Sequence, residues 1–176
     1  LFAGLIREVG EDLTREGLLE TPKRAAAAFR FLNSGYRQNL ETVLNNAVFE
    51  ADTEDMVIVK DIELYSLCEH HLLPFTGVAH IAYLPSDRVI GLGRLPKLVE
   101  VLSARPQLQE NLTAQIADAL EQGLNTKGVV VVIEARHHCV ASRGARQPEA
   151  NTLTMASRGV YGDPIARAEV MALIAK

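Results

Sequence analysis

Hydrophobic positions along the chain follow two periodicities, one typical of helices and one typical of strands. Residues 1–9 form a helical segment that ends at Gly10, and apolar residues recur every three or four positions over 95–102 and 108–120. That spacing is typical of helices with one buried face. Strand-like runs, rich in valine, isoleucine or threonine, are found at 56–64, 77–84, 128–139 and 151–156.

Turn and capping residues set the limits of these elements. Thr21 followed by Pro22 predicts a helix start, with threonine as the N-cap and proline in the first turn, and that helix is expected to stop near 33–35. Asp163 followed by Pro164 predicts a short final helix. The order of helices, two strands, two helices, two strands and a helix predicts an α+β fold, with an antiparallel sheet covered by helices on one face. Such a small sheet has open edges, which favour pairing with another subunit.

Composition narrows the class of protein. With 176 residues and 48% hydrophobic content, the chain is long enough for one well-buried domain. It has no apolar stretch approaching the ~20 residues that span a membrane. A net charge of −4 offers no general attraction to nucleic acid or anionic lipid, so neither is an expected partner. The two cysteines lie among histidines, which favours metal binding over a disulfide. Free thiols of this kind indicate a cytoplasmic location.

The candidate chemistry is concentrated in two short clusters, Cys68-Glu69-His70-His71 and His137-His138-Cys139. Thiolates and imidazoles are preferred ligands of Zn²⁺, which binds three protein ligands and a water when catalytic and four protein ligands when structural. Both clusters together use both cysteines and four of the five histidines. A metal site is therefore favoured over the ordinary alternative, in which each cysteine is a small buried apolar residue.

Spacing suggests which of these residues bind the metal. If 128–139 is a continuous strand, His137 and Cys139 point to the same face. Cys68 and His71 are three apart, so a turn or the start of a helix can bring both to one ion. We therefore expect Cys68, His71 and Cys139 to bind Zn²⁺, with His70 and His137 left for proton transfer. A closed structural site, with His70 or His137 as a fourth ligand, remains an alternative.

Several motifs follow one another from Thr21 almost to the C-terminus: Ser66-Leu67-Cys68-Glu69-His70-His71, Tyr83-Leu84-Pro85, Val89-Ile90-Gly91-Leu92, the segment 105–113, and His137-His138-Cys139-Val140-Ala141-Ser142-Arg143-Gly144. With these motifs in this order, the chain resembles the GTP cyclohydrolase I family. This resemblance implies the tunnelling fold, in which antiparallel sheets of neighbouring subunits join into a barrel. Two pentameric rings typically stack into a decamer with active sites at the interfaces. On this basis 1–50 is expected to be an N-terminal helical segment and 51–176 the tunnelling-fold catalytic domain, together one functional unit.

The same resemblance implies a zinc-dependent enzyme that converts GTP to 7,8-dihydroneopterin triphosphate and formate, the first step of folate and pterin synthesis. Cys68, His71 and Cys139 match the family's zinc ligands, and His70 and His137 match its acid/base residues. Glu110 matches the carboxylate that holds the guanine edge, and Gln109 is expected to help place the base. The triphosphate-binding residues fall on Arg24, Arg94, Lys97 and Arg143.

One segment departs from the family pattern. Where the family commonly has Gly-Leu-Ser-Lys, this chain has Gly91-Leu92-Gly93-Arg94, which removes a hydroxyl near the ribose and triphosphate and keeps the positive charge. The run 151–159 is also looser than the family's Thr/Ser-rich segment. Two alternatives therefore stay open: a paralogue that acts on another purine nucleotide or stops at the ring-opened intermediate, and a non-catalytic pterin-binding subunit with structural zinc.

Overall fold

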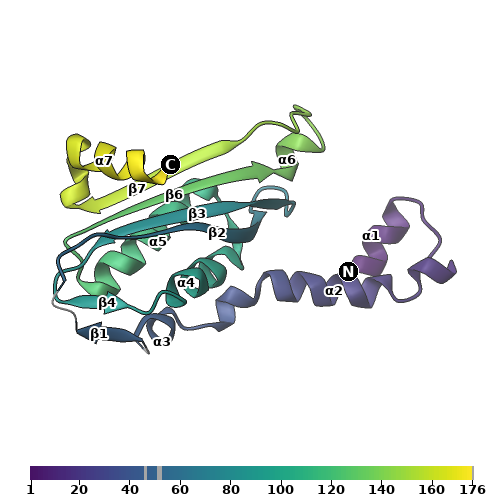
Figure 1. Ribbon diagram of the computed structural model, residues 1–176. Coiled ribbons are helices and arrows are strands. Elements are labelled where there is room, and N and C mark those ends of the chain that lie inside the picture. The colour runs from purple at the N-terminus through teal and green to yellow at the C-terminus, as the bar shows by residue number, and fades with distance from the viewer. Residues whose placement is uncertain (46, 51–52, 176) are drawn as a thin grey trace.

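A helical arm leads into a body made of one sheet and its covering helices in the computed structural model (Figure 1). The structure describes residues 1–45, 47–50 and 53–175. The arm and the segment that joins it to the body contain α1 (Phe2–Glu8), η1 (Glu16–Leu18), α2 (Thr21–Leu32), η2 (Ser34–Arg37) and α3 (Leu40–Asn45). Neither α1 nor α2 buries a residue, so within one chain the arm contributes nothing to the core.

The body is built on a five-stranded sheet of order β5-β2-β3-β6-β7. Its strands are β2 (Val57–Cys68), β3 (Pro74–Leu84), β5 (Pro106–Gln107), β6 (Gly128–His137) and β7 (Thr152–Gly159). All neighbours are antiparallel except β5, which pairs in parallel with the last two residues of β2. A separate two-stranded sheet joins β1 (Val48–Glu50) to β4 (Arg88–Ile90).

Two amphipathic helices, α4 (Arg94–Ser103) and α5 (Gln109–Leu124), bury their apolar sides against one face of the sheet. Strand alternation supplies the facing side chains, since Ile81, Tyr83, Val129, Val131 and Ile133 all belong to this core. At about 25 cal/mol per Å², full burial of each such side chain favours folding by roughly 1.5–3 kcal/mol. The body therefore has a core of its own, which includes Cys68 and against which Cys139 packs.

The prediction that the helices lie on one face is wrong for the last helix. Helix α7 (Pro164–Ile174) packs Val170 and Ile174 against Ala82, Val130 and Val132, which point to the opposite face from α4 and α5. Asp163 caps this helix as predicted, because its side chain accepts hydrogen bonds from the backbone of the first turn. A second correction concerns Thr21: it lies inside α2 and donates to Gly17 O, while Glu20 occupies the N-cap position.

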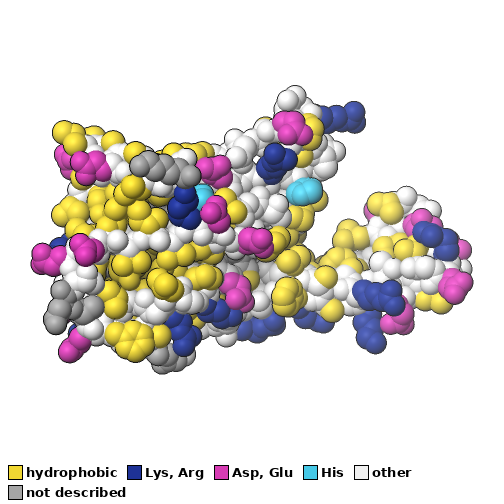
Figure 2. Space-filling model, viewed as in Figure 1, with side chains coloured by type: hydrophobic (Ala, Val, Ile, Leu, Met, Phe, Trp, Pro, Cys, Tyr) yellow, Lys and Arg dark blue, Asp and Glu magenta, His cyan; other side chains and the backbone are white. Residues whose placement is uncertain are grey.

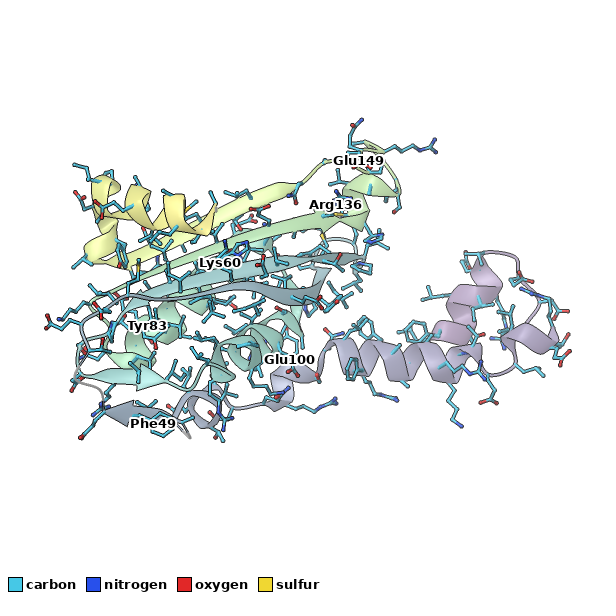
Figure 3. The ribbon with its side chains drawn as sticks, viewed as in Figure 1. Phe49, Lys60, Tyr83, Glu100, Arg136 and Glu149 are labelled. Carbon is cyan, nitrogen blue, oxygen red and sulfur yellow. The ribbon has the colours of Figure 1, made fainter. Side chains whose placement is uncertain are left out.

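We call the two ends of the sheet the Cys68 end and the Tyr83 end, after residues that lie there. Strand β2 runs from Val57, paired with Tyr83, to Cys68, so these ends lie 11 residues apart on one strand. At about 3.3 Å per residue that is roughly 35 Å. Figure 3 shows Tyr83 at one end and Arg136 with Glu149 at the other. No described helix is long and apolar enough to cross a membrane.

Candidate metal centre and active site

A tight turn after β2 brings Cys68 and His71 together at the Cys68 end of the sheet. The Cys68 backbone N–H donates to Leu73 O at 2.8 Å, and the Leu72 N–H donates to Cys68 O at 2.7 Å. Leu72 adopts a left-handed conformation with φ of 55°, which closes the turn. The sequence prediction that a turn joins these two residues is confirmed.

Cys139 reaches the same place by a different route from the one predicted. Strand β6 ends at His137, and residues 138–141 form the single helical turn α6 (His138–Ala141). The alternation of a continuous strand therefore does not place Cys139. The prediction of strand through residue 139 is wrong at its last two positions, because the chain turns into α6 directly after His137.

The three expected ligands form one cluster. The ligand atoms of Cys68, His71 and Cys139 all lie within 4.8 Å of one another, and Cys68 Sγ is 3.8 Å from His71 Nδ1. Zn–S bonds of about 2.3 Å and Zn–N bonds of about 2.0 Å at a tetrahedral angle require S–N separations of roughly 3.5 Å. The donor set and its spacing thus suit a metal ion of this size.

Burial and neighbouring groups shift the pKa of the Cys139 thiol in opposite directions. Burial raises the pKa of Cys139, and the hydrogen bond and charge of Cys68 raise it further, while the Arg143 guanidinium lowers it. Arg143 also lies close to the third ligand, with Nη1 3.0 Å from His71 Nε2. One predicted phosphate-binding cation is therefore beside the metal ligands within the same chain.

The His137 ring is held on two sides. It stacks on Phe75, with ring centroids 4.5 Å apart and planes 11° apart. Its Nε2 lies 2.7 Å from Oε1 of Gln109. Burial lowers the pKa of His137, and the charge of Glu110 opposes that shift. Sequence reasoning did not identify Phe75, because an aromatic residue at the start of a strand carries no signal of which ring it will meet.

The other predicted residues near the cluster differ in exposure. Glu110 is exposed in the first turn of α5. Its neighbour Gln109 is buried, with only 2% of its surface exposed. His70 is exposed, and its ring centroid is 6.2 Å from that of His71. The Cys68 end thus gathers eight residues on the predicted list: Cys68, His70, His71, Gln109, Glu110, His137, Cys139 and Arg143.

Three of the predicted phosphate-binding cations lie away from this cluster within one chain. Arg94 is the first residue of α4 and follows β4, whose Ile90 N–H donates to Tyr83 Oη at 3.4 Å. Arg94 therefore lies towards the Tyr83 end. Lys97 is one turn further along α4 and pairs with Glu100 at 2.8 Å. Arg24 is exposed on α2, in the arm that extends from the body (Figure 1).

Comparison with known proteins identifies relatives over the whole chain. The family model described as GTP cyclohydrolase I matches residues 1–175. A protein of Methylococcus capsulatus named GTP cyclohydrolase 1 is 57% identical over 177 residues, covering 100% of this chain and 96% of the relative. The Campylobacter jejuni protein of that name is 53% identical over 157 residues, covering 89% of this chain and 83% of the relative. A Pseudomonas putida protein named GTP cyclohydrolase 1 1 is 48% identical over 174 residues, with coverage of 98% and 92%.

A solved structure supports the fold alone. The archaeosine synthase QueF-Like in its apo form matches with a TM-score of 0.52 and 17% sequence identity. The match covers 61% of this chain and 97% of the solved chain.

Proposed function

This chain belongs to the GTP cyclohydrolase I family and is an enzyme of that kind, and from this premise we propose how its residues convert GTP to 7,8-dihydroneopterin triphosphate and formate. The observation that carries the proposal is the arrangement at the Cys68 end. A cluster of two thiols and an imidazole lies next to a second imidazole, that of His137, which is held in place by a stacked ring and a hydrogen bond.

Zinc is the metal that this donor set favours. Two cysteines and one histidine leave one position of a tetrahedral ion open, which is the composition of a catalytic rather than a structural site. Bound by Cys68, His71 and Cys139, Zn²⁺ would act as a Lewis acid and make water nucleophilic near neutral pH, as hydrolysis at C8 of guanine requires.

His137 and His70 are the proposed acid/base residues. Hydration of C8, opening of the imidazole ring and loss of formate all move protons on and off nitrogen, and imidazole exchanges protons in the neutral pH range. Burial lowers the pKa of His137, which favours the neutral imidazole that accepts a proton. His70, which is exposed, is free to turn towards the substrate.

Glu110 is proposed to recognise the guanine edge. Its carboxylate only accepts hydrogen bonds, and the guanine N1–H and N2 amino group only donate. Adenine presents an acceptor at N1 and would leave the carboxylate mispaired, at a cost of about 1–3 kcal/mol. The position of Glu110 at the start of α5, exposed and close enough for its charge to act on His137, suits this role.

The triphosphate requires cations, and we propose that they come from more than one subunit. Arg143 of the same chain lies beside His71 and can meet the phosphate nearest the reacting base. Arg94, Lys97 and Arg24 lie elsewhere on the chain, on α4 and α2. Neighbouring subunits would then contribute these cations. Figure 2 shows Lys and Arg side chains over α2 and along the lower side of the molecule, as well as at its upper right.

Several surfaces support an oligomer. Within the described chain, β7 pairs on one side only, and β2 pairs on its outer side only at residues 67–68. Leu153 and Met155 on β7 are 56% and 43% exposed, and Phe31 on α2 is 75% exposed. Strand edges and apolar side chains of this kind favour contact with another chain. We therefore propose that sheets of neighbouring subunits join edge to edge into the barrel of the tunnelling fold, in stacked pentamers. The thiol ligands suit the reducing cytoplasm, where we place the enzyme.

The direct test is turnover of GTP by the purified, zinc-loaded protein, with formate and the pterin product followed together. We expect both products in equal amounts from the wild type and neither from Cys139→Ala. Accumulation of a ring-opened formamide would instead point to a block in the later steps. An inactive wild type that holds one zinc per chain would contradict the proposed reaction.

A further inference from the structure

Gln109 has every polar group of its side chain engaged inside the protein. It is the first residue of α5 and is only 2% exposed. Its amide nitrogen lies 3.0 Å from Ile133 O, 2.9 Å from Thr152 O and 3.1 Å from Thr154 Oγ1. Its amide oxygen lies 2.7 Å from His137 Nε2. Neither end of this amide is free to bind a guanine base.

The strands β6 and β7 determine which way the amide points. Ile133 O and Thr152 O are backbone carbonyls, which only accept hydrogen bonds, so the group that faces them must be the NH₂ end of Gln109. The reverse orientation would place a carbonyl oxygen against two others and leave buried groups unpaired, at a cost of about 1–3 kcal/mol for each. The amide oxygen must therefore face His137.

The orientation of Gln109 in turn determines where His137 carries its proton. An amide oxygen only accepts, so the Nε2 of His137 must donate, and a neutral imidazole with its proton on Nε2 has its lone pair on Nδ1. We propose that Gln109 is a positioning residue that holds His137 in the Nε2–H tautomer, so that Nδ1 is the nitrogen that exchanges a proton with the substrate. This proposal rests on the proposed function for the role of His137, and it replaces the expectation that Gln109 contacts the base.

Two further contacts make the arrangement rigid. Phe75 stacks on the His137 ring and fixes its plane, so the hydrogen bond to Gln109 selects between the two ring orientations in that plane. On the other side, Thr113 Oγ1 lies 2.7 Å from both Gln109 O and Thr154 Oγ1. A buried chain of polar contacts thus connects α5 and β7 to the histidine at the end of β6.

Kinetics separate a positioning role from a substrate-binding role. Gln109→Met keeps the length of the side chain and removes both the acceptor that faces His137 and the NH₂ group that faces the two backbone carbonyls. We expect kcat for GTP to fall about 10- to 100-fold, less than the roughly 100- to 10,000-fold that acid/base catalysis contributes, because His137 itself is still present. KM should change less than about threefold and the zinc content should stay at the wild-type level. A raised KM with kcat retained would overturn the proposal, because that is the signature of a residue that binds the base.

A matched control leaves the orientation intact. Thr154→Val removes one of the three acceptors around the Gln109 amide nitrogen and keeps both backbone carbonyls. Its kcat should fall clearly less than that of Gln109→Met, since the two backbone carbonyls still fix the amide. A loss as large as that of Gln109→Met would mean that packing near β7, rather than the Gln109 acceptor that faces His137, determines kcat.

The tautomer of His137 can be measured by NMR spectroscopy, independently of enzyme turnover. In the zinc-loaded protein labelled with ¹⁵N-histidine, with His137→Asn used to assign the signal, the wild type should show a protonated Nε2 and an unprotonated Nδ1 for His137. Gln109→Met should shift this signal towards a mixture of tautomers. A proton on Nδ1 in the wild type would refute the proposal even if the enzyme is active. An inactive wild type with the Nε2–H signal would refute the reaction and leave the tautomer assignment standing.

Discussion

The two ends of the sheet contrast in how much of the active site a single chain assembles. At the Cys68 end, the turn after β2, the start of α5, the end of β6 and α6 bring eight predicted residues together within one chain. Towards the Tyr83 end and on the arm, Arg94, Lys97 and Arg24 lie on separate helices. The contrast suggests that one chain carries the chemistry of the base, whereas binding of the triphosphate depends on assembly.

The largest loss should follow from removing a metal ligand at the Cys68 end. Cys139→Ala leaves two ligands, and we expect zinc to be lost on dialysis and turnover to fall at least about 1,000-fold. Far-UV circular dichroism should stay close to that of the wild type, because Cys139 is only partly buried and most of the core under α4 and α5 is formed by other residues. His138→Ala, an exposed neighbour, is the matched control and should keep both zinc and activity. Full activity of Cys139→Ala without zinc would break the comparison at its first step.

Removing the proposed acid/base residue should separate chemistry from metal binding. His137→Ala is expected to lower kcat by about 100- to 1,000-fold while the protein keeps one zinc per chain, because general acid/base catalysis contributes in that range. Zinc content and single-turnover rates together test this. Loss of zinc in His137→Ala would instead favour the closed site, in which His137 is a fourth ligand.

The recognition of guanine should depend on Glu110. In Glu110→Gln, one of the two acceptor oxygens becomes a donor that faces a donor on the base. We expect kcat/KM for GTP to fall about 10- to 100-fold, in line with 1–3 kcal/mol for a mispaired group. Glu69→Gln removes an exposed carboxylate close to the metal ligands and serves as a control. An equal loss in both variants would point to the net charge of the region rather than to a contact with the base.

A smaller effect is expected for a cation towards the other end of the sheet. Arg94→Ala should raise KM for GTP about tenfold with zinc content unchanged, because a phosphate contact is lost while the Cys68 end stays intact. Arg94→Lys restores the positive charge and should recover most of the affinity. If Arg94→Ala lowered zinc content, the proposed division between the two ends would be wrong.

The smallest effect should come from restoring the hydroxyl that the family commonly has. A side chain at Gly93 would meet no atom within 4 Å in the single chain, so Gly93→Ser fits without strain. We expect a change in kcat/KM of at most about fivefold, and an increase if the hydroxyl contacts the phosphate, since a neutral hydrogen bond contributes about 1 kcal/mol. A large gain would show that Gly93 limits the enzyme.

Local patterns were sufficient to predict most of the fold. The valine run after Gly128 forms β6, the apolar spacing of Leu112, Ile116 and Leu120 forms the buried side of α5, and the pair Asp163-Pro164 starts α7. The face of the sheet that α7 covers could not be predicted, because its apolar residues fit either side equally well. Strands as short as β5 fall below any sequence signal.

The site was predictable in its residues and not in its contacts. The histidines and cysteines indicated Cys68, His71 and Cys139 as candidate ligands, since few other side chains bind zinc, and the structure brings the three together. The contact between Gln109 and His137 joins residues 28 positions apart on a helix and a strand. Only the packing of α5 on the sheet brings the two residues together, so their spacing along the sequence does not predict the contact.

The most direct test of the division between the ends is subunit complementation. Cys139→Ala chains and Arg94→Ala/Lys97→Ala chains should each be poorly active with GTP held below KM. Co-expressed in equal amounts as mixed oligomers, they should regain about a quarter of the wild-type activity. That is the share of sites in which random mixing joins an intact Cys68 end to intact cations of a neighbour. A mixture no more active than the average of the two separate variants would contradict the account and place the whole site in one chain.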